Sequence, residues 1–290
     1  MFANILVNGL AMGGMYAVLA VGFSLVFGVA RILNMAHTAF MMVATFLVFI
    51  ALTVYDLQVV ATGLLAVILT AALGLICFKL FFDRIKEHPT TVMIIAVALA
   101  MLFQEILLMI FTGTHHGVPS YIEGYITIFD TRVTNDRVLA IGFSAVVLIG
   151  LWFLLNKTRL GNAIRVVAED REVANLMGIN VSYIFMVVMV ISVSLAAIAG
   201  VVMAPILMIN PVMWLPPLIV VLAAVVLGGL GSLGGSVIGA FILGFAETVV
   251  VFLVPSGSFL RSAVALAVML VVLMVRPEGL FGVMFEEERL

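Results

Sequence analysis

The sequence predicts an all-α membrane protein: a bundle of about eight to ten membrane-spanning helices in a single domain over residues 1–290. Of the 290 residues, 65% are hydrophobic and only 10% are charged, a composition outside the range of soluble globular proteins. Apolar runs of roughly 20 residues, the length that crosses a bilayer as a helix, recur along nearly the whole chain. These runs are apolar on all sides, whereas strands of a membrane β-barrel would alternate in polarity over about 10 residues.

Nine apolar segments follow one another, separated by short gaps that hold most of the charged residues. The N-terminus lacks a basic region and an A-x-A-like cleavage site, so we interpret the first segment as a membrane span and not as a removable signal peptide. The nine segments cover residues 5–29, 37–54, 59–81, 91–112, 138–155, 181–203, 217–229, 235–254 and 261–275.

Two places in this series depart from a simple succession of full spans. The seventh segment, residues 217–229, is shorter than the roughly 20 residues that a complete crossing needs. It begins at a pair of prolines and ends in the run GGLGSLGG, so we expect a half-helix or a tilted, broken helix. The first gap, residues 31–36, is tight and suits a re-entrant connection.

Basic residues predict the orientation, because cytoplasmic loops carry an excess of lysine and arginine. If the nine segments alternate and the N-terminus lies outside, ten of the 13 basic residues fall on the cytoplasmic side. Only Arg132, Arg137 and Arg261 fall outside, and the reverse orientation would invert this ratio. We therefore expect the N-terminus outside and the C-terminus in the cytoplasm. The ten cytoplasmic residues are Arg31, Lys79, Arg84, Lys86, Lys157, Arg159, Arg165, Arg171, Arg276 and Arg289.

The longest polar interruption, residues 156–180, carries seven of the 28 Asp, Glu, Lys and Arg residues and falls on the cytoplasmic side. Apolar residues from Leu160 to Val167 recur at helical spacing, which predicts an amphipathic helix. Asp170 can cap a second short helix, and Gly178 suits the left-handed position that ends one. A solvated loop is the alternative. A capped helix pair is more structure than a linker requires, which favours docking of a soluble partner.

Motifs for enzymatic chemistry or metal binding do not occur in the sequence. The Walker A pattern G-x-x-x-x-G-K-[ST] is missing, so any ATPase must be a separate subunit. No Ser-His-Asp-like constellation with recognisable surroundings, no H-E-x-x-H and no C-x-x-C spacing is found. The single cysteine, Cys77, excludes an intramolecular disulfide. We therefore expect a protein that is not an enzyme and that binds neither a metal nor a cofactor.

Glycines gather in the first segment and between the seventh and eighth. Gly9 and Gly13 form a G-x-x-x-G pattern, whose usual role is close helix packing. For the second group two interpretations stay open: close packing, or a break in the helix that lines a cavity, because irregular backbone at membrane depth must face protein or water. This second group comprises Gly228, Gly229, Gly231, Gly234 and Gly235.

Polar and ionisable residues inside the spans are few. Glu105 lies in the fourth segment and Glu247 in the eighth, and a carboxylate at such depth usually faces a cavity or a partner. Glu247 fits either a translocation path or a hydrogen-bonded structural role, and Glu105, beside Gln104, fits a seam between helices. Asn34 suits a capping and turn role in the first gap. His37 as a proton relay would need acidic partners, which the sequence does not show.

Four ordered stretches resemble one known family, the membrane permease subunits of ABC importers for branched-chain amino acids, particularly the LivH type. The opening NGLAMGGMYAVLAVGFSLVFGVARILNMAH ends in the family's N-x-A-H. The stretch RLGNAIRVVAEDREVANLMGIN resembles its cytoplasmic signature. The glycine-rich VVLGGLGSLGGSVIGAFILGFAET and the tail VRPEGLFG follow in the expected order. Together they cover nearly the whole chain.

The resemblance implies partners that the residues alone do not show. Such a permease, with a fold like the larger-bundle (type II-like) importer permeases, pairs with a second homologous permease, two cytoplasmic ATP-binding subunits and a periplasmic or extracellular substrate-binding protein. ATP and Mg would be used by the ATPase subunits, and none would be bound by this chain. The outer loop 113–137, with Asn210 and Pro211, would face the binding protein. The chain would sit in a bacterial or archaeal cytoplasmic membrane, in contact with lipid and with no nucleic acid.

The resemblance also implies two sets of functional residues. The cytoplasmic segment would be the coupling region that sits in a groove of an ATPase subunit, and the glycine break would move against the first spans during alternating access. The coupling residues would be Arg165, Ala168, Glu169, Asp170, Ala174 and Gly178. The translocation path would include Asn34, His37, Glu247, Gly228, Gly229, Gly231, Gly234 and Gly235.

Other functions remain alternatives at this point. Members with the same signatures carry urea, short amides or aromatic acids, because substrate choice rests largely with the binding protein. A passive facilitator would act without a partner and would leave the cytoplasmic segment unexplained. A proton- or sodium-coupled transporter would need ionisable groups within the membrane, and only Glu105, Glu247 and His37 are available. A non-transporting scaffold would tolerate loss of Glu247.

Overall fold

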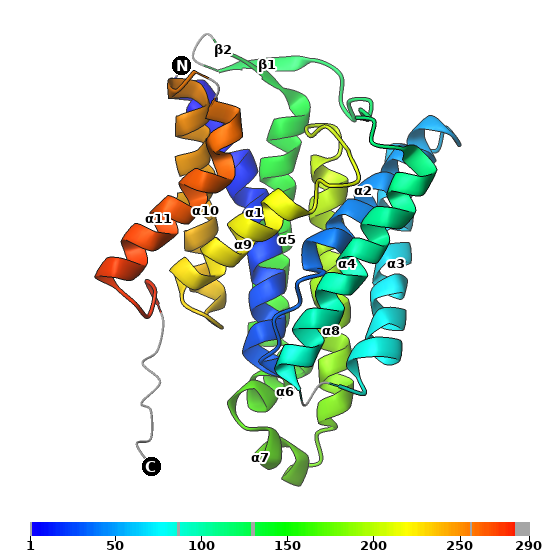
Figure 1. Cartoon of the computed structure of the whole chain (residues 1–290), viewed down its shortest axis with the longest axis vertical. Coiled ribbons are helices and arrows are strands. Elements are labelled where there is room, and N and C mark those ends of the chain that lie inside the picture. The colour runs from blue at the N-terminus through cyan, green and yellow to red at the C-terminus, as the bar shows by residue number, and fades with distance from the viewer. Residues whose placement is uncertain (1, 86–87, 129–130, 256, 282–290) are drawn as a thin grey trace.

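The computed structural model describes residues 2–85, 88–128, 131–255 and 257–281, which form a bundle of α-helices with one short β-hairpin (Figure 1). Each of the nine predicted apolar segments contains one helix, so the predicted helical bundle is confirmed. These helices are α1 (Phe2–Ala30), α2 (His37–Thr53), α3 (Val59–Cys77), α4 (Pro89–Phe111), α5 (Asn135–Lys157), α8 (Val181–Met203), α9 (Leu215–Gly228), α10 (Leu233–Leu253) and α11 (Arg261–Val275).

Helix length separates the nine into two groups. Among the described residues six helices are long and apolar enough to cross a membrane: α1, α3 with its π-helical extension Phe78–Phe82, α4, α5, α8 and α10. The count of eight to ten is therefore reached only when the shorter α2, α9 and α11 are included. Helix α9 has 14 residues, about 21 Å, against a hydrocarbon core of about 30 Å. The prediction of a short or broken seventh helix is confirmed.

Helix α1 runs through the middle of the bundle (Figure 1). Its most apolar stretch is 83% buried, whereas the corresponding stretches of α3, α4 and α5 are 22–28% buried. A helix that is hydrophobic all round belongs in such a central position. Leu19 and Ala20 of α1 are inaccessible to solvent. The core of the protein is therefore built around α1, with α8 and α10 packed against it.

Small residues let α1 and α10 approach closely. A Cβ added to Gly244 of α10 would lie 2.6 Å from the Gly13 Cα of α1, closer than side chains tolerate. Gly13 in turn packs on Phe241, and Gly9 packs on Phe245. Because lipid offers no hydrophobic force between helices, close van der Waals packing of this kind holds membrane helices together. The packing interpretation of the G-x-x-x-G pattern is confirmed.

The helix connections lie at two opposite ends of the bundle (Figure 1). The N-terminus and an antiparallel hairpin of β1 (Tyr125–Ile128) and β2 (Thr131–Thr134) lie at one end. Two short helices, α6 (Arg159–Glu169) and α7 (Arg171–Leu176), lie at the other. The sequence did not predict the hairpin.

The basic residues are divided between these two ends as the predicted orientation requires. Helices α1 and α3 both run toward the α6–α7 end, so Arg31 and Arg84, which follow them, belong to that end. Arg132 lies in the hairpin, and Arg137 lies in the first turn of α5, which follows the hairpin. Lys86 and Arg289, which also counted toward the cytoplasmic side, lie outside the described residues.

The segment between α1 and α2 returns into the bundle. His37, the first residue of α2, places its Nε2 atom 3.0 Å from the carbonyl oxygen of Leu19. Leu19 precedes Ala30 by 11 residues, about 17 Å along the helix at 1.5 Å per residue. Residues 31–36 therefore climb from the end of α1 back to the level of Leu19 (Figure 1). The prediction of a re-entrant connection is confirmed.

Candidate functional site

The first half of the predicted coupling segment, residues 156–180, is helix α6. The Thr158 hydroxyl accepts a hydrogen bond of 3.1 Å from the Gly161 amide and so caps the helix at its N-terminus. Ile164 and Val167 are only 2% and 1% exposed, while Arg165 and Glu169 face solvent. The predicted amphipathic helix is confirmed.

The second half is helix α7, and its two ends are built as the sequence predicts. The Asp170 carboxylate accepts hydrogen bonds from the Glu172 amide at 2.8 Å and the Val173 amide at 3.0 Å, which satisfies amides that have no partner within the helix. Ala174 is fully buried and anchors the helix. Gly178 follows with a φ of +80°, the left-handed conformation that favours glycine.

Helix α7 also presents an apolar face to solvent. Val173, Leu176 and Met177 are 46%, 87% and 68% exposed, and their i, i+3, i+4 spacing puts them on one face. They lie at the end of the bundle beyond the long helices (Figure 1), so lipid does not explain their exposure. We call these three residues the α7 apolar face. A contiguous exposed apolar patch marks a surface for a partner. Sequence reasoning missed this face, although its spacing was readable.

Arg171, the first residue of α7, reaches the end of α1. Its Nη2 donates hydrogen bonds to the carbonyl oxygens of Ala30 at 2.7 Å and Val29 at 3.4 Å. The guanidinium carbon lies 4.8 Å from the centre of the Phe185 ring, a cation–π contact. Partial burial, together with the nearby charge of Arg31, lowers the pKa of Arg171 from its usual value. Arg171 was not among the predicted coupling residues, and no local pattern in the sequence marks this contact.

The predicted glycine break is the loop between α9 and α10. Gly229 and Gly231 adopt φ values of +97° and +86°, which only glycine adopts without strain. A Cβ added to Gly28 of α1 would lie 3.5 Å from the Gly231 carbonyl oxygen, so the loop rests on the last turn of α1. Gly228 and Gly235 meet backbone to backbone across the loop. Both interpretations hold here: the helix is broken, and the glycines allow close packing.

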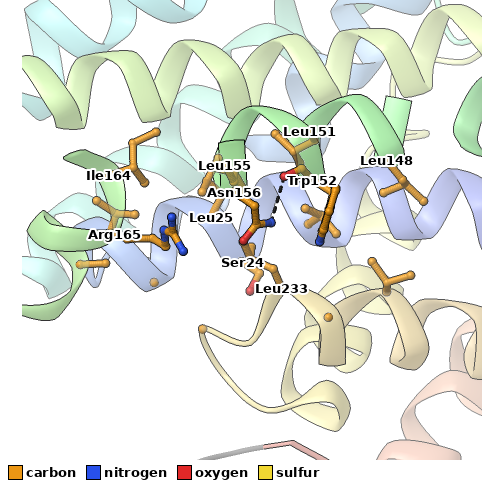
Figure 2. A pocket seen from close by; sticks show the side chains of 17 residues that line it. Ser24, Leu25, Leu148, Leu151, Trp152, Leu155, Asn156, Ile164, Arg165 and Leu233 are labelled. Carbon is orange, nitrogen blue, oxygen red and sulfur yellow. Dashed lines mark hydrogen bonds between the residues drawn. The ribbon is translucent and has the colours of Figure 1, made fainter. Parts of the chain in front are cut away.

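A cavity of about 300 Å³ lies beside the last turns of α1, bordered by α5, α6 and α10 (Figure 2). Arg165 and Ala168 of the predicted coupling set line it, and so do Gly231 and Gly234 of the glycine loop. Ser24 of α1 adds a buried hydroxyl without a hydrogen-bond partner among the described residues. The structure therefore brings members of both predicted sets together at one place beside α1.

Asn34 and His37 lie inside the bundle, on the re-entrant connection and at its upper end. The side-chain amide oxygen of Asn34, Oδ1, accepts a hydrogen bond of 3.2 Å from the Ala36 amide, which confirms its turn role. The two nitrogens of His37 contact the Leu19 carbonyl at 3.0 Å and the Ser192 hydroxyl at 3.1 Å. His37 is fully buried. Its described partners are thus a carbonyl and a hydroxyl, and a role in the path stays a prediction.

Glu247 lies apart from the glycine loop and the coupling segment. It is 2% exposed in the seam between α10 and α1, where the Tyr16 hydroxyl donates to its Oε2 at 2.9 Å. Its second oxygen has no hydrogen-bond partner among the described residues. Tyr16 precedes Ala30 by 14 residues, about 21 Å along α1, so Glu247 lies far from the coupling segment.

Glu105 is exposed on α4, so the expectation of a helix seam is wrong within this chain. The Gln104 amide donates to the Glu105 carboxylate at 3.3 Å. The Trp214 indole donates to Gln104 at 2.8 Å, which fixes the direction of the Gln104 side chain. Glu105 thus faces out of the bundle at membrane depth.

The outer segments predicted to face a binding protein lie together. The backbone of His116, in the 113–137 loop, exchanges two hydrogen bonds of 2.9 Å with Ile209. Ile209 directly precedes Asn210, the second predicted element of this surface. The Asp136 carboxylate orders the loop further by accepting hydrogen bonds from the Tyr121 and Ile122 amides at 3.0 and 3.2 Å.

This architecture defines a multi-pass membrane protein with a capped helix pair and an exposed apolar face at one end, an arrangement suited to a transport subunit that docks on a soluble component. Residues 5–273 match the family described as the permease component of branched-chain amino acid transport systems, and the chain belongs to that family. It is a transport subunit of the ABC permease class and not an enzyme.

Full-length relatives agree with this assignment, and a solved structure shares the fold. The high-affinity branched-chain amino acid transport system permease protein BraD of Pseudomonas aeruginosa is 29% identical, over 96% of this chain and 94% of its own length. The corresponding LivH protein of Escherichia coli K12 is 26% identical, over 97% of this chain and 96% of its own. PsaBC from Streptococcus pneumoniae, solved in complex with a Fab, superposes with a TM-score of 0.50 at 15% identity, over 95% of this chain and 92% of that chain. The last likeness concerns the fold alone.

Proposed function

We propose that this chain forms half of the translocation pathway of an ATP-driven importer for branched-chain, hydrophobic amino acids. A second homologous permease would complete the pathway, two cytoplasmic ATPase subunits would use ATP and Mg, and a binding protein outside would deliver the substrate. The bundle would belong to the larger, type II-like class of importer permeases. The family assignment and the names of the relatives support the substrate class.

The observation that carries the coupling role is the α7 apolar face. Val173, Leu176 and Met177 are exposed on one side of a short capped helix that lies beyond the membrane-spanning part. Apolar anchors at i, i+3 and i+4 are the pattern by which a helix seats in a groove of a partner. The neighbouring Glu169, which is also exposed, would contribute a polar contact at the rim of this interface. The surface fits the soluble ATPase subunit of the importer.

The distribution of charge supports the proposed orientation, with the N-terminus outside. Arg31, Arg84 and the basic residues of the 156–180 segment belong to the end that carries α6 and α7. By the positive-inside rule this end lies in the cytoplasm, where an ATPase can reach it. The hairpin and the loop that His116 ties to Ile209 would then lie outside and face the binding protein.

The exposed carboxylate of Glu105 supports a partner within the membrane. An ionisable side chain inside a span faces protein or a water-filled cavity, because lipid solvates it poorly. Glu105 is uncovered in the single chain, and its neighbour Gln104 is held by Trp214. We infer that the surface of α4 around Glu105 faces the second permease or the pathway between the two.

Copurification tests the proposed function. Tagged chain, extracted in mild detergent with its natural neighbours, should bring down two ATP-binding subunits and a second permease, and the eluate should hydrolyse ATP. Reconstituted in vesicles with the binding protein, the complex should accumulate leucine, isoleucine or valine in an ATP-dependent way. Uptake of urea or an aromatic acid instead would correct the substrate, and solute flux from a complex without any ATPase would replace the importer by a facilitator.

A further inference from the structure

We propose that Arg171 is the positioning residue that carries movement of the coupling segment to the end of α1, and from there to the re-entrant connection and the glycine loop. This inference rests on the proposed function, because it assumes that an ATPase subunit acts on α7. It adds a residue and a route that neither the sequence motifs nor the family assignment supplies.

The contact joins α7 to α1 through a hydrogen-bond donor and two acceptors that have no partner within their own helix. The last carbonyls of a helix have no partner within the helix, and the end of a helix carries partial negative charge. The carbonyls of Val29 and Ala30 are such groups, and both accept from the guanidinium of Arg171. A planar guanidinium can bond two oxygens while its face lies on an aromatic ring. Phe185 of α8 provides that ring at 4.8 Å.

The backbone of Arg171 is part of α7 and moves with that helix. Arg171 is the first residue of the helix and follows Asp170, whose carboxylate caps it. Ala174, one turn later, is fully buried. A displacement of the α7 apolar face by a partner therefore moves the Cα of Arg171 with the helix, and the guanidinium pulls on the carbonyls that it holds.

The end of α1 continues into the re-entrant connection and contacts the glycine loop. The residue after Ala30, Arg31, adopts a φ of +54°, and the chain then climbs without regular structure to Asn34 and His37. Gly28, one turn of helix away, rests on Gly231 of the glycine loop. A shift of the end of α1 is therefore passed both to the re-entrant connection and to the break between α9 and α10.

The test uses the intact complex and three variants. Arg171→Met removes the donors and the cation, Arg171→Lys keeps a cation that can reach one carbonyl, and Arg276→Met is the control. Arg276 is an exposed arginine just after α11, and its hydrogen bond is local, to the Leu280 carbonyl. We expect Arg171→Met to keep assembly and ATP hydrolysis within about twofold but to lower substrate moved per ATP by more than about fivefold. Arg171→Lys should lie between, and Arg276→Met should match the wild type.

Hydrogen exchange separates transmission from a merely structural role. In the wild-type complex, nucleotide binding should change exchange in residues 156–180 and also in residues 27–36. In Arg171→Met the first change should persist and the second should disappear. If both changes survive with normal coupling, Arg171 transmits nothing and the inference is wrong. If the wild-type complex has no ATPase, or nucleotide leaves residues 156–180 unchanged, the proposed function itself fails.

Discussion

The guanidinium of Arg171 donates a hydrogen bond of 2.7 Å to the carbonyl oxygen of Ala30, which joins the first turn of α7 to the last turn of the central helix α1. The two residues are 141 positions apart in the sequence. Around this contact lie the capped helix pair, the start of the re-entrant connection and the glycine loop. The predicted coupling segment and the glycine loop of the predicted path, though not Glu247, therefore meet at one structural junction.

Two substitutions of Asp170 distinguish the effect of its capping hydrogen bonds from the effect of its negative charge. Asp170→Ala removes the acceptor for two amides, and loss of such a cap costs about 1 kcal/mol of helix stability. Asp170→Asn keeps an acceptor of similar geometry, because asparagine caps nearly as well. We expect transport per ATP to fall several-fold in the alanine variant and to stay near wild type in the asparagine variant. Equal loss in both, measured in reconstituted vesicles, would show that the charge contacts the ATPase directly.

The α7 apolar face should decide whether the ATPase binds. Leu176 is 87% exposed, so Leu176→Asp leaves the fold of the permease intact while placing a charge in the centre of the proposed contact. We expect recovery of the ATPase subunits in a pull-down to fall by more than about tenfold, with membrane insertion unchanged. Asn175→Asp is the matched control, since Asn175 is exposed on the same helix outside the apolar face. Wild-type recovery with Leu176→Asp would remove α7 from the interface.

How far the sequence predicts this structure depends on whether the determining interactions are local. The caps at Asp170 and Gly178 follow from residues within one turn, and both were predictable. The α7 apolar face was also readable from the spacing of Val173, Leu176 and Met177. The contact of Arg171 with Ala30 and that of Tyr16 with Glu247 span 141 and 231 positions, so only the packing of the bundle could reveal them.

Other differences follow from context as well. The hairpin of β1 and β2 went unpredicted because its two strands have four residues each, too few for a clear alternating pattern. Glu105 was expected in a helix seam, yet it faces outward. The sequence could not show this, because a helix that is apolar on all sides gives no signal of which side meets the bundle. Orientation of such helices is set by neighbours, which a single sequence does not display.

The glycine loop should be sensitive to a single added carbon. A Cβ at Gly235 would collide with the backbone of Gly228, and overpacking of this kind costs about 1–3 kcal/mol. We expect Gly235→Ala to lower the melting temperature in detergent by several degrees and to reduce transport. Gly142→Ala is the control, because nothing lies within 4 Å of the added atom in α5 and alanine favours helix. Equal melting temperatures for the two variants would contradict the close approach.

The pair Tyr16–Glu247 can be assigned to structure or to transport by a double-mutant cycle. Tyr16→Phe removes the one described donor to a buried carboxyl, and an unsatisfied buried polar group costs about 1–3 kcal/mol. If the pair only joins α1 to α10, Tyr16→Phe and Glu247→Leu should each lower thermal stability. The double variant should then be less destabilised than the sum, because replacing both partners by apolar groups can be nearly neutral. Transport per ATP should follow stability in all three.

A role of Glu247 in the translocation path gives the opposite pattern in the same variants. Glu247→Gln keeps the size of the side chain and its ability to accept from Tyr16, so stability should change little. A structural acid would leave transport near the wild-type rate in this variant. A large loss of transport by Glu247→Gln, at unchanged melting temperature and unchanged ATPase recovery, would place the carboxylate on the path despite its burial. Because the seam is 2% exposed at Glu247 in this conformation, α1 and α10 would then have to separate during the cycle.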